Sequence, residues 1–587
     1  MANAIEAVDG ELFGLREALG LANRERYPEY LVEQGFADEV KGSMHETFQA
    51  SFLASGTFPC GPDALQSRYI TEDVPYALVL ASSIGDEVGA DTPGHRCPDR
   101  PGIRRDQDRL ADGGADVGRV GSRGGGDRGI APSRGGGVVV VDLRVAGGTV
   151  VTVDGEARVV REDLYVDRGR IASIGGQPRE ARRTLDATGM LVMPGLINLH
   201  DHLRDLTPGI RLGEGLKLDA MLRRFWELSR AAGPDEYRVG AALRTAKLLK
   251  SGVTSVVDHL YPFHQAVLTE ASIRGYESTG IRWFMARGIM TRPYRPISES
   301  ARRALRAIED LADGLVPKEC LFVAPVSFRQ AVPSEYVQAR RLADRLGLRV
   351  YTHVAETPAE IDMIRKDHGA RPVALLHDIG FAASDAILVH CVYLSAAEIG
   401  TLARSGATVV HCPTNHMRLA KGITPVPKLL EAGANVGMGI DQMDDLFVEM
   451  RQEILMQGLH HSNPGVVAPR TSLEMATVRG AAALGLGDEL GRIEVGRRAD
   501  LVCVDVSAPH LQPVLDPVWT LVHRVHGHDV AHVVVDGDVV VENGKLARVN
   551  EDDLVEEARS VAASYMRRAG VSAERVWSVG TPVGGVS

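Results

Sequence analysis

Six polar residues in this sequence follow directly on short apolar runs, and their types are those that metal-assisted chemistry requires. They are His200, His202, His353, Glu356, His390 and Asp441. Imidazole nitrogens and carboxylate oxygens are ligands that a divalent metal takes from proteins. The same side chains serve as general acids and bases beside such a metal. We therefore expect one polar cup that is built from the ends of several strands.

The motif LHDH supplies a pair of predicted ligands. Positions i and i+2 of a strand face the same way, so His200 and His202 should project together while Asp201 points away. A catalytic zinc site keeps about three protein ligands and an open position for water. The predicted metal ligands are the nitrogens of His200, His202 and His353 and an oxygen of Asp441.

Three side chains are predicted to do the chemistry beside this metal. The metal lowers the pKa of a bound water to about 7, which yields hydroxide at neutral pH, and Asp441 can take the proton of that water. Glu356 is predicted to carry a proton to the leaving group or to a ring nitrogen. His390 would orient the hydroxide or polarise the substrate. The alternatives are a surface carboxylate or helix-terminal charge for Glu356 and a hydrogen-bonded core histidine for His390.

Short apolar strands alternate with longer amphipathic stretches over the middle of the chain. Eight strands are predicted near residues 191–200, 253–258, 282–288, 321–327, 349–356, 386–393, 408–414 and 434–441. Eight β/α alternations fit an α/β fold of the (β/α)8 TIM-barrel type, which keeps its chemistry at the C-terminal ends of the strands. We expect this barrel over residues 194–484. The β-rich segments 138–193 and 485–550 should pair into one composite β-sandwich side domain.

The chain outside these regions has a different character. Residues 1–93 predict a short helical piece, and residues 551–587 a C-terminal helix and tail. Residues 94–137 are rich in Gly and Arg and poor in large apolar residues, which predicts a disordered linker. The GxGxxG match that begins at Gly124 lies in this tract without a strand before it or a helix after it, so we interpret it as chance.

The first 93 residues resemble a known helical domain. The stretch RYITEDVPYALVL (residues 68–80) and Thr92-Pro93 are similar to the C-terminal end of the helical domain of octopine/nopaline-type opine dehydrogenases. Such enzymes also need a nucleotide-binding βαβ unit, and none precedes this segment in the sequence. We therefore interpret this region as a fragment and expect no redox activity and no NAD from it; the alternatives are a functional fusion and a gene-fusion or frameshift remnant.

Bulk composition narrows the classes of partner. The 587 residues carry a formal net charge of −11 and no extended basic patch in the predicted folded part, which argues against nucleic acid. No apolar run reaches the ~18 residues of a membrane helix, and no signal peptide is visible. The six cysteines are scattered without a CxxC pair, which suits a reducing cytoplasm. We expect a cytoplasmic protein with a small-molecule partner, and a homo-oligomer is possible.

Residues 138–550 resemble the amidohydrolase superfamily, and within it the single-metal branch of aminohydrolases. The resemblance rests on the stretches PGLINLHDH, GVTSVVD, HVAET, HCV, HCPTNHMRLAKGITPVPKLLEAGANVGMGID and GRIEVGRRADLVCVD. It implies a (β/α)8 barrel, a composite β-sandwich and one bound divalent metal, zinc before iron. It also implies hydrolytic removal of an amino group from a ring. Metal ligation carries over onto His200, His202, His353 and Asp441, and catalysis onto Glu356 and His390.

Three departures from the family pattern bear on the substrate. Val326 stands where nucleoside-deaminating members have a histidine, Asn415-His416 replaces a Ser-Asn pair, and QMDDLF follows where a Gly- and Asn/Ser-rich loop is usual. These changes argue against adenosine-type substrates and leave a purine, pyrimidine, pterin or triazine-like ring open. Predicted substrate contacts are Phe328, Arg329, Gln330, His411, His416 and Gln442. The alternatives are loss of a halide or alkylamine from such a ring, and a non-catalytic assembly protein on the same fold.

Overall fold

A computed structural model describes residues 140–204, 206, 215–443 and 445–570 of the chain. The chain divides into two compact units, Met1–Ala131 and Pro132–Ser587, and the described residues all belong to the second. The helical piece predicted for residues 1–93, the linker predicted for 94–137 and the tail after residue 570 lie outside the described residues.

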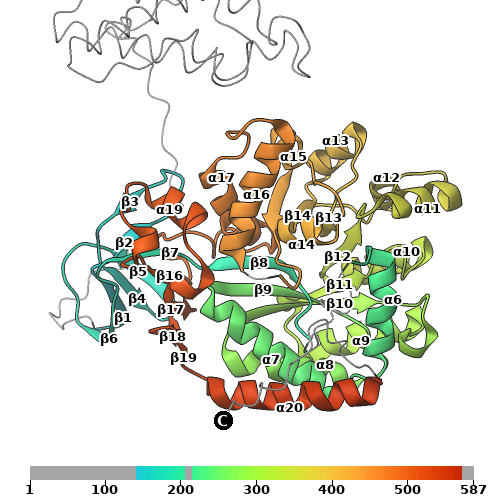
Figure 1. Ribbon diagram of the computed structural model, residues 1–587, viewed down its shortest axis with the longest axis horizontal. Helices are drawn as coiled ribbons and strands as arrows, with labels where there is room; N and C mark the ends of the chain where they lie inside the picture. The colour runs from blue at the N-terminus through green and yellow to red at the C-terminus, as the bar shows by residue number, and fades with distance from the viewer. Residues whose placement is uncertain (1–139, 205, 207–214, 444, 571–587) are drawn as a thin grey trace, which may run out of the picture. The chain divides into compact units, whose positions relative to one another are not determined.

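Eight parallel strands form the central sheet, with neighbours in strict chain order (Figure 1). They are β8 (Leu196–Asp201), β9 (Val253–Leu260), β10 (Arg282–Ile289), β11 (Leu321–Pro325), β12 (Arg349–Val354), β13 (Ala386–His390), β14 (Thr408–His411) and β15 (Asn435–Met438). The ring is drawn together just after β15, where the amides of Ile440 and Asp441 donate to the carbonyl of His200. The predicted (β/α)8 architecture is confirmed.

Helices on the outer side connect the strands (Figure 1). The main ones are α6 (Leu218–Ser229), α7 (Pro234–Lys250), α8 (Val267–Thr279), α9 (Ala301–Asp310), α10 (Pro333–Leu346), α11 (Pro358–His368), α12 (Pro372–Asp378), α13 (Ala396–Ser405), α14 (Pro413–Arg418), α15 (Val426–Glu431), α16 (Leu446–His461), α17 (Pro469–Met475) and α18 (Val478–Ala483). The sequence specifies several of their ends. Thr357 caps α11 by accepting a hydrogen bond from the Glu360 amide, and Gly347 ends α10 in the left-handed region at φ 71°.

The predicted first strand is two strands of two different sheets. Residues 191–200 include most of β7 (Met190–Pro194), which lies in the side domain, and the start of β8, which lies in the barrel. Gly195 separates them, and a Cβ there would lie 2.1 Å from the Thr254 hydroxyl oxygen. A continuous apolar run gives no sign of this change of sheet, because both strands are buried.

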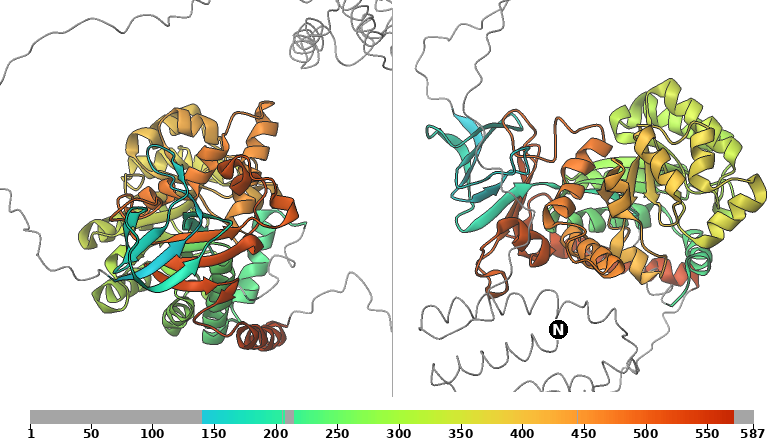
Figure 2. Two further views of the ribbon diagram at one scale, coloured as in Figure 1. Left: turned by 90° about the vertical axis from the view of Figure 1, so that its left-hand side faces the viewer. Right: turned by 90° about the horizontal axis from the view of Figure 1, so that it is seen from above.

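The side domain contains two sheets from both ends of the described chain, drawn beside the barrel in Figure 2. One has the order β5 (Arg170–Ile174), β4 (Leu164–Asp167), β1 (Val141–Ala146) and β6 (Ala181–Asp186). The other has the order β19 (Lys545–Leu546), β18 (Asp538–Glu542), β17 (Val530–Val535), β16 (Leu501–Asp505), β7, β2 (Thr149–Val151) and β3 (Val159–Val160). Side chains of both sheets share one apolar core, which includes Leu143, Val166 and Leu501.

The barrel and the side domain are joined by buried charges as well as by apolar contacts. Arg282 at the start of β10 pairs with Asp500, next to β16, and its Nη2 lies 2.6 Å from the Asp536 carboxylate. The short helix α19 (Pro517–His523) and the long C-terminal helix α20 (Glu551–Ala569) complete the unit. Among the described residues, no helix is long and apolar enough to cross a membrane.

Apolar side chains fill the barrel interior beneath the predicted site. Val257 of β9 and Tyr351 of β12 belong to this buried cluster. Because side chains alternate along a strand, His259 and His353 face the same way two residues further on. The strand pattern thus places polar side chains as a layer on top of the apolar interior.

Candidate metal centre and active site

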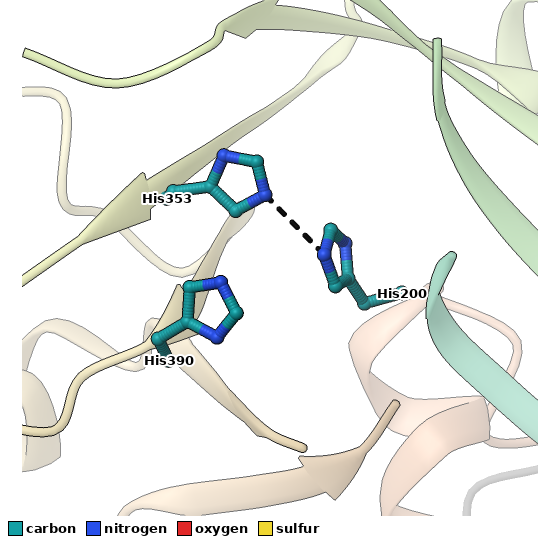
Figure 3. A group of neighbouring side chains, drawn as sticks. All are labelled: His200, His353 and His390. Carbon is teal, nitrogen blue, oxygen red and sulfur yellow. Dashed lines mark hydrogen bonds between the residues drawn. The ribbon is translucent and has the colours of Figure 1, made fainter. Parts of the chain in front are cut away.

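Histidines from different strands meet at the C-terminal end of the barrel. Figure 3 shows the rings of His200, His353 and His390 pointing toward one another from β8, β12 and β13. Nε2 of His200 lies 3.3 Å from Nε2 of His353. Asp441, after β15, brings Oδ1 to 3.4 Å from Nε2 of His200 and to 3.7 Å from Nε2 of His202. All four predicted ligands therefore converge.

The outer ring nitrogens of the three predicted ligands have partners that fix the tautomer. Nδ1 of His202 donates to the carbonyl of His259 at 2.8 Å, and Nδ1 of His353 donates to the carbonyl of Val326 at 2.9 Å. Nδ1 of His200 lies 2.7 Å from the Tyr351 hydroxyl, which itself donates to a backbone carbonyl. With the proton on Nδ1 in each case, the Nε2 lone pairs face the centre and are free for a metal.

The spacing of these atoms fits a tetrahedral ion. Zinc–ligand bonds of about 2.0–2.1 Å place neighbouring ligand atoms about 3.4 Å apart. The distances of 3.3, 3.4 and 3.7 Å among His200, His202, His353 and Asp441 agree with that value. Asp201 points away, as predicted, and accepts hydrogen bonds from Arg244 and Asn198.

Electrostatics put these groups in the ionisation states that ligands need. Burial lowers the pKa of His202 to about 4 and holds the pKa of His353 well below its ordinary value. Burial alone would raise the pKa of Asp441, but His200, Lys421 and His202 together outweigh it, so the pKa of Asp441 lies well below its ordinary value. Neutral imidazoles and an ionised carboxylate are the forms that bind a divalent metal.

Several residues at this end of the barrel have backbone conformations that are unfavourable for side chains other than glycine. Ala355, His390, Cys391, Asp441 and Gln442 all have positive φ, between 48° and 78°. Such conformations cost free energy and persist where the surrounding structure enforces them. Here they turn the chain just where the strands deliver their polar side chains.

Both carboxylate oxygens of Glu356 lie within ion-pair distance of other side chains. Oε1 lies 2.7 Å from Nζ of Lys421 and 3.2 Å from Nε2 of His390, and Oε2 lies 3.2 Å from Nη1 of Arg329. The amide of Glu356 donates to the buried carboxylate of Glu360 at 3.0 Å. Glu356 is thus a buried, fixed carboxylate of the cup, and neither an exposed side chain nor a helix-capping charge.

His390 is oriented by a second histidine. Its Nδ1 lies 3.0 Å from Nε2 of His416, and its Nε2 faces Glu356. This nitrogen is 4.0 Å from Oδ2 of Asp441. Because Nε2 of His390 is engaged by Glu356, the ring fits a role beside the metal better than a place among its ligands.

Some of the predicted substrate contacts line the cavity over the site and others do not. Arg329, Gln330 and Gln442 line it. Phe328 is buried and stacks on Tyr336, away from the cavity. His411 and His416 are also buried without lining it. The first pairs with Glu453 at 2.8 Å, and the second supports His390.

His259 and Lys421 are among the polar residues at the site that were not singled out from the sequence. His259 of β9 is fully buried, with its ring centroid 4.5 Å from that of His353. Because His259 stands two residues after the apolar Val257 on the same strand, alternation could have predicted that its side chain also faces the barrel interior. Lys421 lies in the loop between α14 and α15, and its side chain is 2% exposed. A single lysine in a loop has no pattern that would reveal its burial.

Comparison with known proteins places this geometry in a family. The model of the amidohydrolase family matches residues 191–540, which span the barrel and all four convergent ligands. The chain belongs to the amidohydrolase family. A second model, for the alpha-helical domain of NAD/NADP octopine/nopaline dehydrogenases, matches residues 1–96. Both predicted resemblances are confirmed.

Relatives of this amidohydrolase include proteins named as deaminases. A 5-methylthioadenosine/S-adenosylhomocysteine deaminase of Halobacterium salinarum is 36% identical over 438 residues, covering 73% of this chain and 99% of the relative. An adenosine deaminase from Xanthomonas campestris, solved with bound zinc, superposes with a TM-score of 0.68 at 29% identity and covers 73% of this chain and 99% of that one.

A second kind of solved structure is similar to the same degree. A mutant of atrazine chlorohydrolase from Arthrobacter aurescens, complexed with zinc and atraton, has a TM-score of 0.67 at 26% identity. The match covers 72% of this chain and 100% of that chain. By their names, the similar solved structures thus include one protein that removes an amino group and one that removes chloride.

Proposed function

We propose that this amidohydrolase removes an amino group hydrolytically from a nitrogen heterocycle, with one zinc ion held by His200, His202, His353 and Asp441. The observation that carries the proposal is the convergence of these ligands, with their Nδ1 atoms occupied, beside Glu356 and His390. Two of the similar solved structures hold zinc, which favours zinc over iron. The deaminase names of the relatives support the choice of reaction.

Each side chain of the cup has a defined task in this proposal. A divalent metal would supply Lewis-acid activation of a water molecule. Asp441 would accept the proton of that water, since its carboxylate is ionised and its Oδ1 lies 3.4 Å from Nε2 of His200. Glu356 transfers a proton to the ring nitrogen or to the departing amine. His390 donates from Nε2 toward the reacting oxygen and is held in place by His416.

Loss of another group from a similar ring is the second candidate. The observation that favours it is the similarity to an atrazine chlorohydrolase. Attack on an electron-poor ring carbon serves both reactions, so the leaving group alone distinguishes them. An assembly protein without catalysis is a weaker candidate, because each predicted ligand lies in a cluster that could hold a metal: His200 with His202 and Asp441, and His200 with His353 and His390.

Metal analysis and ammonia release on the same preparation test the proposal. Purified protein would be incubated with purines, pyrimidines, pterins and triazines while bound metal is counted by atomic emission. We expect about one zinc per chain and ammonia from one ring class. The variant His200→Ala should lose both, whereas His377→Ala, a substitution of an exposed histidine on α12, should lose neither. A metal-free protein without turnover would refute the proposal, and halide or alkylamine release without ammonia would favour the second candidate.

We further infer that the reaction needs only residues 138–570. The site is built entirely from residues between His200 and Gln442, and the side domain packs on the barrel through Arg282 and Asp500. The dehydrogenase-like segment then has no part in the chemistry, which fits an origin of the chain by gene fusion. We place the protein in the cytoplasm.

A further inference from the structure

A lysine is buried inside the proposed active site. Lys421 follows α14 in a tight loop, where its amide donates to the carbonyl of His416 at 2.9 Å. Ala420 and Gly422 on either side have φ of 48° and 116°. A Cβ at Gly422 would lie 2.9 Å from the Tyr393 hydroxyl oxygen, so the loop is closely packed. This packing turns Lys421 inward and leaves its side chain 2% exposed.

The contacts of Lys421 are with the reacting groups themselves. Its Nζ lies 2.7 Å from Oε1 of Glu356 and 3.8 Å from Oδ2 of Asp441, and the residue lines the cavity. Taking an ammonium out of water costs several kcal/mol, which only close partners offset. The close partner of this ammonium is Glu356. Packing alone does not explain a charge at this position, because an apolar side chain of similar length could fill the space without that cost.

Substrate binding changes the pairing of this ammonium. Once Glu356 is also engaged with a ring nitrogen, its Oε1, which it already shares between Lys421 and His390, pairs less fully with the ammonium. The ammonium then needs a second acceptor within reach of the same carboxylate. An oxygen on the ring atom next to that nitrogen would supply it. A ring without such an oxygen would leave a buried charge poorly paired, which sites of this kind reject strongly.

We propose that Lys421 is a specificity residue that binds a ring oxygen of the substrate. The substrate class is a heterocycle in which one ring nitrogen separates an amine-bearing carbon from an oxo-bearing carbon. Glu356 serves the nitrogen, and Lys421, 2.7 Å from Glu356, binds the oxygen. Adenine-type rings lack this oxygen and are poor substrates. This inference rests on the proposed function and narrows its substrate.

Matched pairs of rings test the inference on the zinc-loaded full chain. The pairs are 2-amino-4-oxopyrimidine with 2-aminopyrimidine, guanine with 2-aminopurine, and diamino-oxo-triazine with its triamino counterpart. Adenosine serves as a reference substrate without the ring oxygen. We expect kcat/KM for ammonia release to be at least about 100-fold higher for the oxo member of the preferred pair. Calorimetry with uracil and xanthine, the oxo products, measures ring binding without turnover.

Substitution of the lysine separates binding of the oxygen from positioning of Glu356. Lys421→Met should lower kcat/KM for the oxo ring and weaken binding of its product by at least about 30-fold, while kcat/KM for the ring without the oxygen changes little. Lys421→Arg should restore part of the binding. Lys428→Met, the same change at an exposed lysine on α15, should alter neither. Unfolding midpoints of all three variants identify any loss of fold.

The outcomes distinguish the two levels of proposal. If no ring releases ammonia and no metal is bound, the proposed function fails. If ammonia is released but kcat/KM for the rings without the oxygen equals or exceeds kcat/KM for their oxo counterparts, the inference about Lys421 fails and the proposed function stands. An equal loss for both ring types in Lys421→Met also overturns it, because Lys421 would then only position Glu356. The wild-type comparison decides the question even if the variant does not fold.

Discussion

Gly439 lies against the proposed metal ligand His200, so adding a single methyl group there tests the proposed centre. A Cβ at Gly439 would lie 2.7 Å from Cβ of His200, 3.0 Å from Sγ of Cys412 and 3.1 Å from Cγ1 of Val410. Ordinary carbon contacts are about 3.5–4.0 Å, so Gly439→Ala requires His200 to move by about 1 Å. The Tyr351 hydroxyl contacts the ring at Nδ1, and the carbonyl of His200 accepts from the amides of Ile440 and Asp441, so these hydrogen bonds oppose that shift.

A displacement of this size should be visible in both metal content and rate. A misplacement of about 1 Å costs on the order of 100-fold in turnover, and we expect zinc to be held at less than one per chain unless it is added in excess. The assays are atomic emission after gel filtration and kcat/KM for ammonia release.

A matched glycine provides the control for this experiment. Gly314 is exposed, has no positive φ and has nothing within 4 Å of the added Cβ, so Gly314→Ala should behave as wild type. A folded Gly439→Ala enzyme with one zinc per chain and wild-type kcat/KM would refute the reasoning, because it would show that His200 need not hold its present position.

Three further predictions concern the ligand set, the domain interface and the dispensable segment. Asp441→Asn should lose turnover and most bound metal with the unfolding midpoint retained, and an active variant would contradict the proposed ligand set. Arg282→Met leaves the Asp500 carboxylate buried without its partner, so we expect a loss of about 3–5 kcal/mol in stability, seen as a lower midpoint in thermal unfolding; an unchanged midpoint would argue against it. A chain without residues 1–137 should keep its kcat/KM, and loss of activity in a folded truncation would give that segment a role.

A fourth prediction concerns the pH dependence of stability. Burial raises the pKa of Asp258 to about 6, so its stabilising contribution is complete below the unfolded pKa of about 4 and is lost as the pH rises through 6. Asp258→Asn removes this dependence. The midpoint of the variant relative to wild type should therefore rise between about pH 4 and 6 and stay level at higher pH, and a constant difference across this window would show that Asp258 does not titrate there.

The local sequence pattern was sufficient to predict most of the fold and the proposed metal ligands. Alternation of apolar strands and amphipathic segments indicated eight β/α units, because parallel strands under a layer of helices must be apolar on both faces. Ligand residues could be read because they stand where such strands end: His200, His202, His353 and Asp441 each follow an apolar run. The same pattern did not predict the change of sheet at Gly195, because β7 and the start of β8 are both buried and apolar.

The tertiary structure decided which side chains face which atoms. His416 supports His390 from behind instead of reaching the substrate, and Phe328 packs into the core. Lys421 meets Glu356 across 65 residues of sequence through a loop whose direction depends on its own packing. Sequence determines residue types and their order along strands, through local periodicity. Only the closed barrel brings strand ends and loops to within hydrogen-bond distance, so the pairing of charges in the cup is a property of the fold.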